Sequence, residues 1–275
     1  MAYTAYPNAA AVSSGSTHTK GAYVQVTAAT PYDSSRLYLY VVTSDAQSRH
    51  FLVDVATGAA SAETVIVANV AVASGSALTV IGEVIQIDVD IPAGSRLAVR
   101  CQAAGATQTV NIVVYLEDRA VASLANPVTY GAVTASTRGT SVDPGTTALT
   151  KGAYVQLSAS TTARIDVLLC CFTTIAPGTN IAVFQTWFVD VATGAASAET
   201  IVIPDIRVDV SSFDDYVKPV FLRLPISIPA STRVAVRCSC SVNTATLRLL
   251  AVTLIGMQEP SAPSGAGERS VAYLG

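Results

Sequence analysis

The sequence predicts an all-β protein made of two tandem antiparallel β-sandwich domains of a jelly-roll-like kind. Three observations predict this class: a long internal duplication, alternation of apolar and polar residues with a period of two, and turn residues at short intervals. Helical periodicity is nearly absent. The duplicated unit is much longer than a solenoid repeat of roughly 20 to 50 residues, so we expect two separate domains.

The duplication consists of three matching blocks in the same order. The offset between the copies drifts only from 131 residues, for Lys20 and Lys151, to 137 residues, for Ile91 and Ile228, which small loop insertions explain. The blocks are KGAYVQ at 20–25 and 151–156, VDVATGAASAET at 53–64 and 189–200, and IPAGSRLAVRC at 91–101, which returns as IPASTRVAVRC at 228–238.

The first unit shows the strand pattern plainly. From Ile85 to Ile91 the odd positions are apolar and the even positions polar, which predicts a strand with one buried face. The next strand shows the same alternation, with Leu97, Val99 and Cys101 on its apolar face. Seven or eight strands at this spacing predict a sandwich or a jelly roll. The expected strands are 20–28, 35–43, 50–56, 63–72, 84–91, 96–102 and 107–117.

The second unit repeats the pattern. Pro225 falls inside one of its strands, and because proline cannot donate to a central ladder we expect an edge strand or a bulge there. The expected strands are 151–158, 163–173, 183–192, 199–209, 219–228, 233–240 and 244–255.

Segments rich in Ala, Thr, Ser and Gly precede each unit and follow the second. They have too little apolar surface to offset the entropy of ordering alone, so we expect them to contact other subunits of an oligomer. The expected organisation is an extended N-terminal arm at 1–18, a sandwich at 19–118, a linker at 119–148, a second sandwich at 149–256 and a flexible tail at 257–275.

Composition argues against several classes of partner. A net charge of -3 without a basic stripe argues against nucleic acid, and no apolar run reaches the ~18 residues of a membrane helix. The N-terminus lacks a basic start and an apolar core, so we expect no secretory signal and synthesis in the cytoplasm. Only three of the 16 basic residues are lysines, which commonly protect exposed strand edges. We therefore expect partner subunits to cover much of the surface.

Residue patterns typical of catalysis are nearly absent. His18 and His50 have no partner at metal or triad spacing, so we interpret them as turn or surface residues. The sequence has no nucleophile elbow, phosphate loop or zinc-binding HExxH helix. We predict a protein that is not an enzyme and holds no cofactor or metal.

The repeated carboxylates Asp54 with Glu63, and Asp190 with Glu199, leave three interpretations open. They could be a glycosidase pair, calcium ligands, or acceptors of backbone N–H groups near the Thr-Gly turn. We favour the last, because both pairs lie in the duplicated block and would otherwise make two identical sites. The motif residues predicted to be structural are Val53, Asp54, Thr57, Gly58, Glu63, Val189, Asp190, Thr193, Gly194 and Glu199.

Five cysteines are candidates for buried thiols or for a disulfide. Cys101, Cys238 and Cys240 share the apolar faces of their strands, which favours buried free thiols. Cys170 and Cys171 are adjacent, so their side chains should point to opposite faces and one should look outward. The odd number leaves an intersubunit disulfide as the minority hypothesis.

The combination of VDVATGAASAET, IPA[GS][ST]R[LV]AVRC and the alternating strand at 106–115 resembles small β-sandwich virion proteins of tailed bacteriophages. The resemblance recurs in both units. It implies a structural role on the virion, as a collar or neck component, a head decoration or a fibre. The implied partners are copies of the chain and other virion proteins, and no binding residue is carried over.

The rival hypothesis is a carbohydrate-binding, receptor-recognition protein of the same particle, because the loops of β-sandwiches often present sugar sites. Sugar platforms usually need exposed aromatic residues, and Trp187 is the only tryptophan. It has no counterpart tryptophan in the first unit. We interpret it as a core or interface residue.

Overall fold

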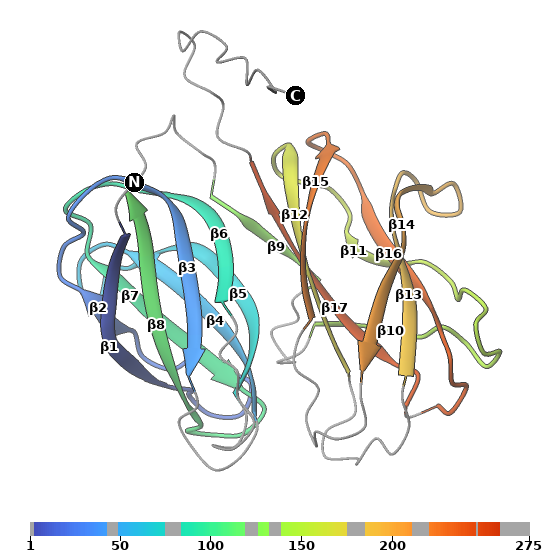
Figure 1. The fold of residues 1–275 in the computed structure, drawn as a ribbon, viewed down its shortest axis with the longest axis horizontal. Coiled ribbons are helices and arrows are strands. Elements are labelled where there is room, and N and C mark those ends of the chain that lie inside the picture. The colour runs from blue at the N-terminus through green and yellow to red at the C-terminus, as the bar shows by residue number, and fades with distance from the viewer. Residues whose placement is uncertain are drawn as a thin grey trace, which may run out of the picture.

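The computed structural model confirms an all-β chain, with four antiparallel sheets that form two sandwich-like domains (Figure 1). Among the described residues no helix is long and apolar enough to cross a membrane. The described residues are 3–42, 49–74, 84–118, 126–131, 139–174, 185–210, 220–245 and 247–258.

The first domain packs sheet A against sheet B. Along each strand of sheet A the residues alternate, so that Leu37 and Leu39 enter the core while Tyr38 and Tyr40 face outward. Sheet A has the order β1 (Tyr3–Ser13), β8 (Thr109–Asp118), β3 (Ser34–Val42) and β6 (Val84–Ile91). Sheet B has the order β2 (Val24–Thr27), β7 (Leu97–Ala103), β4 (Arg49–Thr57) and β5 (Thr64–Ser74).

The second domain repeats this topology with sheets C and D. Sheet C has the order β10 (Thr140–Val142), β17 (Leu250–Met257), β12 (Ile165–Thr174) and β15 (Val220–Ile228), and β9 (Val128–Tyr130) also pairs with β17. Sheet D has the order β11 (Val155–Ser158), β16 (Val234–Cys240), β13 (Gln185–Thr193) and β14 (Thr200–Val210). Within the described ranges each strand pairs only inside its own domain. The order of the strands in both domains is that of a jelly roll.

Every strand expected from the alternation pattern is present. The prediction for Pro225 is also confirmed, since β15 is the edge strand of sheet C and its register with β12 shifts between Ile165 and Val167, opposite this proline. Proline is tolerated there because the outer edge of β15 needs no ladder donor.

The extended arm expected at 1–18 is instead largely the first strand of its own domain. β1 pairs with β8 in two halves, Tyr3 to Tyr6 and Ala10 to Ser13, with a register shift between them. The hydrogen-bonding groups along the edge of β8 would otherwise lack ladder partners, and β1 satisfies them. This segment therefore needs no neighbouring subunit to become ordered, contrary to our expectation.

The linker expected at 119–148 likewise supplies the first strand of the second domain. β9 and β10 pair with β17, as the two halves of β1 pair with β8. Residues 119–125 and 132–138 lie outside the described residues. So does most of the expected tail, 259–275, whereas Met257 is buried in β17.

Apolar residues on the outer face of sheet C join the core of the first domain, while the second domain keeps a separate core of its own. The outer face of sheet C packs across the narrow side of the first sandwich, which β5 and β6 form (Figure 1). Val167, Leu169, Ile255 and Met257 join the core cluster of the first domain. On the sheet B side, Cys171 packs with Leu52 and Ala71.

Candidate functional site

The duplicated motif forms the same polar network in both domains. The carboxylate of Asp54 accepts hydrogen bonds from Lys20 Nζ at 2.7 Å, from Arg100 Nε at 2.9 Å and from the backbone N–H of Asn69 at 2.9 Å. Asn69 has a φ of 54° and lies next to a register shift in β5, so its N–H leaves the regular ladder. Asp54 therefore satisfies a backbone donor that the bulge exposes.

The copy in the second domain keeps this geometry. Asp190 accepts from Lys151 Nζ at 2.8 Å, from Arg237 Nε at 2.9 Å and from the N–H of Asp205 at 3.0 Å. Burial alone would raise the pKa of Asp190, but these donors together hold that pKa below its ordinary value. Arg237 also lies 4.6 Å from the ring centroid of Tyr154, as Arg100 does from the ring of Tyr23 in the first domain.

The remaining motif residues close the turn between β4 and β5. Arg96 Nη1 donates to the carbonyl of Gly58 at 3.1 Å and to Glu63 at 3.0 Å. Gly58 has a φ of 107°, a conformation that favours glycine. In the second domain Arg233 makes the same contacts with Gly194 and Glu199. Thr57 and Thr193 end β4 and β13, and Val53 and Val189 lie in the cores.

The described residues contain no group of three or more His, Cys, Asp and Glu side chains that could hold a metal ion. Each motif carboxylate is instead paired with a cation. His18 lies in a turn with a φ of 57°, as expected. His50 is buried in β4, which corrects our interpretation of it as a turn or surface residue.

The five cysteines are free and buried. Burial raises the pKa of Cys101, Cys170 and Cys238 to about 12, so these thiols stay protonated and unreactive. Cys170 faces its own core, and Cys171 points away from it, as alternation requires. Cys171 is nevertheless covered, because the first domain packs on that face.

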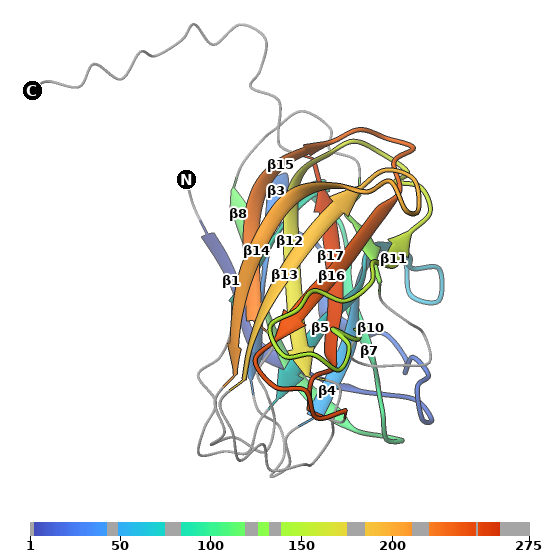
Figure 2. The same ribbon diagram turned by 90° about the vertical axis from the view of Figure 1, so that its right-hand side faces the viewer.

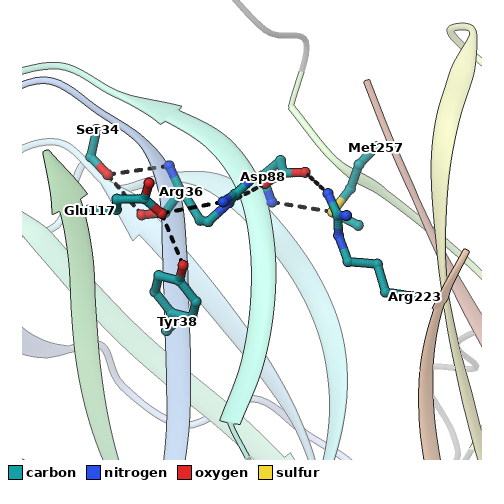
Figure 3. A network of polar contacts seen from close by, with 7 residues as sticks. All are labelled: Ser34, Arg36, Tyr38, Asp88, Glu117, Arg223 and Met257. Atoms are coloured by element: carbon teal, nitrogen blue, oxygen red, sulfur yellow. Dashed lines mark hydrogen bonds and ion pairs between the residues drawn. The ribbon is translucent and has the colours of Figure 1, made fainter. Parts of the chain in front are cut away.

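A second network, not predicted from the sequence, joins the domains (Figure 3). Asp88 in β6 is fully buried and pairs with Arg36 Nε at 2.8 Å and with Arg223, which reaches across from β15. The backbone N–H of Asp88 donates to Met257 Sδ at 3.2 Å. One carboxylate therefore links both sandwiches.

The same network extends onto the outer face of sheet A. Arg36 Nη1 also lies 3.4 Å from Glu117, and the hydroxyl of Tyr38 donates to Glu117 at 2.9 Å. Burial, together with this hydrogen bond, raises the pKa of Tyr38 to about 12. Tyr38 is therefore held neutral with its ring in a fixed place on the sheet.

Tyr38, Tyr40 and Tyr115 lie on this outer face. Tyr38 lies opposite Tyr115 on one side and opposite Gln86 on the other, while Tyr40 lies opposite Val84, which is 53% exposed. All three rings are half-buried. We name this surface the tyrosine face, made of Tyr38, Tyr40, Val84, Gln86 and Tyr115. Tyrosine rings with polar tips suit contact with a protein surface or a sugar ring.

The second domain exposes apolar residues on its narrow side. Ile201 in β14 is 41% exposed, and its neighbours are half-buried although they point toward the core. We name this surface the open side, made of Ile201, Val202, Ile203, Leu222, Leu224 and Ile226. Its counterpart in the first domain is the β5–β6 side, which sheet C covers.

Trp187 is fully buried, as expected, and its indole N–H donates to the carbonyl of Arg248 at 2.8 Å. Its place in the register corresponds to Phe51 of the first domain. The tryptophan is therefore a core residue and not a surface platform. The tyrosine face escaped the sequence reasoning, although a signal was present: the alternation RLYLY at 36–40 places two tyrosines on one face.

No family model matches the chain, and a search of curated proteins finds no match. Among solved structures the chain is similar to PNGF-II in a C2 crystal form, with 8% identity and a TM-score of 0.40, covering 90% of this chain and 63% of that one. A P21 form of PNGF-II gives 9% identity and the same TM-score, covering 93% and 65%. The chain thus spans slightly less than two thirds of PNGF-II.

A tandem CBM22-1–CBM22-2 domain from Paenibacillus barcinonensis Xyn10C is also similar, with 10% identity and a TM-score of 0.29, covering 94% of this chain and 93% of that one. Similarity at this level carries no function over to this chain. Its function has to be argued from its own residues.

Proposed function

We propose that this chain is a non-catalytic structural protein that works by assembling with copies of itself. The observation that carries the proposal is the open side of the second domain. In the first domain Val67 and Ile87, at two of the equivalent positions, are fully buried, whereas Val65, the counterpart of Ile201, is half-buried. In the second domain Ile203 and Leu224 occupy the same register positions and remain partly exposed.

Apolar core residues left half-covered along a narrow side lose part of the favourable free energy of burial, about 25 cal/mol per Å². A protein partner on that side recovers it. A contiguous exposed apolar patch is typical of an interaction surface. The low charged fraction of 13% favours the same role.

The particle on which we place this protein is the virion of a tailed bacteriophage, as a collar, neck, head-decoration or fibre component that assembles with other virion proteins. This finer proposal rests on the sequence motifs alone. The polar network of the duplicated motif stabilises the fold in both domains. A network of this kind is compatible with a scaffold role and equally with any other role of this fold.

The test is the mass of the purified full-length chain, measured by size-exclusion chromatography with light scattering. We expect a defined multiple of 28.3 kDa that persists at high salt, because an apolar contact is little screened. Purified particles should also contain the chain at a fixed copy number. A monomer at every soluble concentration, absent from purified particles, would contradict the proposal.

A second candidate function is carbohydrate binding, which the tyrosine face favours. Tyr38 lies opposite Gln86 in the strand register, and an aromatic ring near a hydrogen-bonding side chain is what a sugar ring requires. A glycan array with the native protein and Tyr40→Ala tests it. Tyr154→Ala, on the outer face of sheet D, is the control, and equal binding by all three proteins would reject the tyrosine face as a sugar site.

A further inference from the structure

The two domains dock through one pair of surfaces, and the chain uses this way of docking only once. The outer face of sheet C covers the β5–β6 side of the first domain. The internal duplication provides a second surface of each kind. The counterpart of the sheet C face is the outer face of sheet A, and the counterpart of the β5–β6 side is the open side.

The strand registers establish the first equivalence. Leu169 in β12 lies opposite Ile255 and Arg223. Tyr38 in β3 lies opposite Tyr115 and Gln86 in the same way. The tyrosine face therefore occupies the position in the first domain that the docking face occupies in the second.

The same registers relate the individual contacts. Tyr40 lies opposite Val84 and Val113, as Cys171 lies opposite Phe221 and Thr253. Tyr40 is thus the counterpart of Cys171, the residue that packs on Ala71 at the domain contact.

The open side differs from its counterpart in a matching way. Arg207 lies opposite Phe188, as Ala71 lies opposite Leu52, so Arg207 stands where Ala71 stands in the first domain. Arg207 is 66% exposed in its side chain and pairs with Asp209 at 2.8 Å. Where the domain contact places a thiol against an alanine, the unused surfaces would place a tyrosine ring against a guanidinium. That pairing is favourable.

We infer that the tyrosine face of one copy docks on the open side of a second copy, in the way that sheet C docks on the first domain. This inference rests on the proposed function and names the surfaces that carry it. Tyr40 then lies against Arg207 of the second copy, and the rings of Tyr38 and Tyr115 cover the apolar residues of β14 and β15. Tyrosine is enriched in such interfaces because its ring is apolar and its tip polar.

In a dimer, the tyrosine face and the open side of both copies can all be covered. In Figure 2 the strands β1, β8 and β3 of sheet A and the pair β14 and β15 lie toward the same, left-hand flank of the molecule. A second copy related by a two-fold axis can place its open side on the tyrosine face of the first while its own tyrosine face receives the open side of the first. The expected species is a closed dimer with two equal contacts.

The experiment uses a charge exchange across the contact in the full-length protein. Tyr40→Arg puts a guanidinium against Arg207, and Arg207→Glu puts a carboxylate against the ring of Tyr40. Each variant damages both contacts of its dimer, so we expect dimer dissociation to increase about a hundredfold, about tenfold for each contact. An equimolar mixture should recover the dimer, because one contact becomes an opposite-charge pair and the other is native.

Arg164→Glu is the matched control. Arg164 is exposed to 65% in its side chain and pairs with the carboxylate two residues ahead at 2.8 Å, as Arg207 does, yet it lies outside the proposed contact. Arg164→Glu should keep the native dimer. A chain ending at Gln258 should also keep it, and loss of the dimer on that truncation would overturn the inference in favour of residues 259–275 as the occupant of the open side.

The outcomes separate the inference from the proposed function. An oligomer that neither Tyr40→Arg nor Arg207→Glu weakens would overturn these surfaces while leaving assembly intact. A mixture that stays monomeric would overturn the pairing of Tyr40 with Arg207. A native chain that is monomeric throughout would overturn both proposals, and loss of glycan binding in Tyr40→Arg without a change in mass would assign the tyrosine face to a sugar.

Discussion

Asp88 should be one of the most sensitive polar positions in the chain. Its side chain is 0% exposed and lies between the guanidinium groups of Arg36 and Arg223, which are 19% and 33% exposed. Removing one partner from a buried ion pair costs about 3 to 5 kcal/mol, because the other charge stays buried without compensation. The cost should lie at the lower end here, since Arg36 keeps Glu117 at 3.4 Å and Arg223 can be rehydrated.

We therefore expect Asp88→Ala to lower the free energy of unfolding by about 3 kcal/mol and Tm by roughly 6 °C for a chain of this size. Urea unfolding should be followed by the fluorescence of Trp187, which reports the second domain, and by far-UV circular dichroism, which reports both. In the native protein the two transitions should coincide because apolar residues of sheet C belong to the first domain's core and so couple the two domains. In Asp88→Ala they should separate.

The control is Arg223→Ala, which removes the ion pair between the domains but leaves Asp88 paired with Arg36. It should cost clearly less than Asp88→Ala. The double variant should cost less than the sum of the two single variants, because both remove the same pair. A loss below about 1 kcal/mol for Asp88→Ala, with coincident transitions, would refute the idea that this carboxylate holds the domains together.

Three further results are expected. Cys101 and Cys238 should resist alkylation in the native protein because they are buried and their pKa lies at about 12; rapid labelling of either, detected by mass spectrometry, would contradict this. Because its pKa is lowered in the folded state, Asp190 should contribute stability that is complete above its unfolded pKa of about 3.9 and is lost as pH falls through the lower folded pKa. Urea unfolding at stepped pH should thus show a shallower acid slope in Asp190→Asn, and an unchanged slope would argue against it. Trp187 is fully buried, so iodide should quench its fluorescence only after unfolding; ready quenching of the folded protein would show that the core is open.

Local patterns in the sequence were sufficient for all strands but the first of each domain, for the two-domain division and for the burial of Trp187. Alternation specifies one buried face for each strand, and both copies of the duplicated block carry the same pattern. Pro225 was placed correctly because the missing N–H restricts it to a strand edge or a bulge. The first strand of each domain was missed, because the segment from Tyr3 to Ser13 is rich in alanine and has little apolar contrast between its two faces.

Only the tertiary structure decided which surfaces are covered. Cys171 and Tyr40 occupy equivalent positions in strands of the same pattern, yet one is buried between the domains and the other stays partly exposed. The ion pairs of Asp88 with Arg36 and Arg223 join strands far apart in the chain, and no local pattern in the sequence predicts them. Alternation determines which side chains point away from a sheet's own core. Whether another sheet then lies on that face depends on long-range packing, which the period of a single strand does not encode.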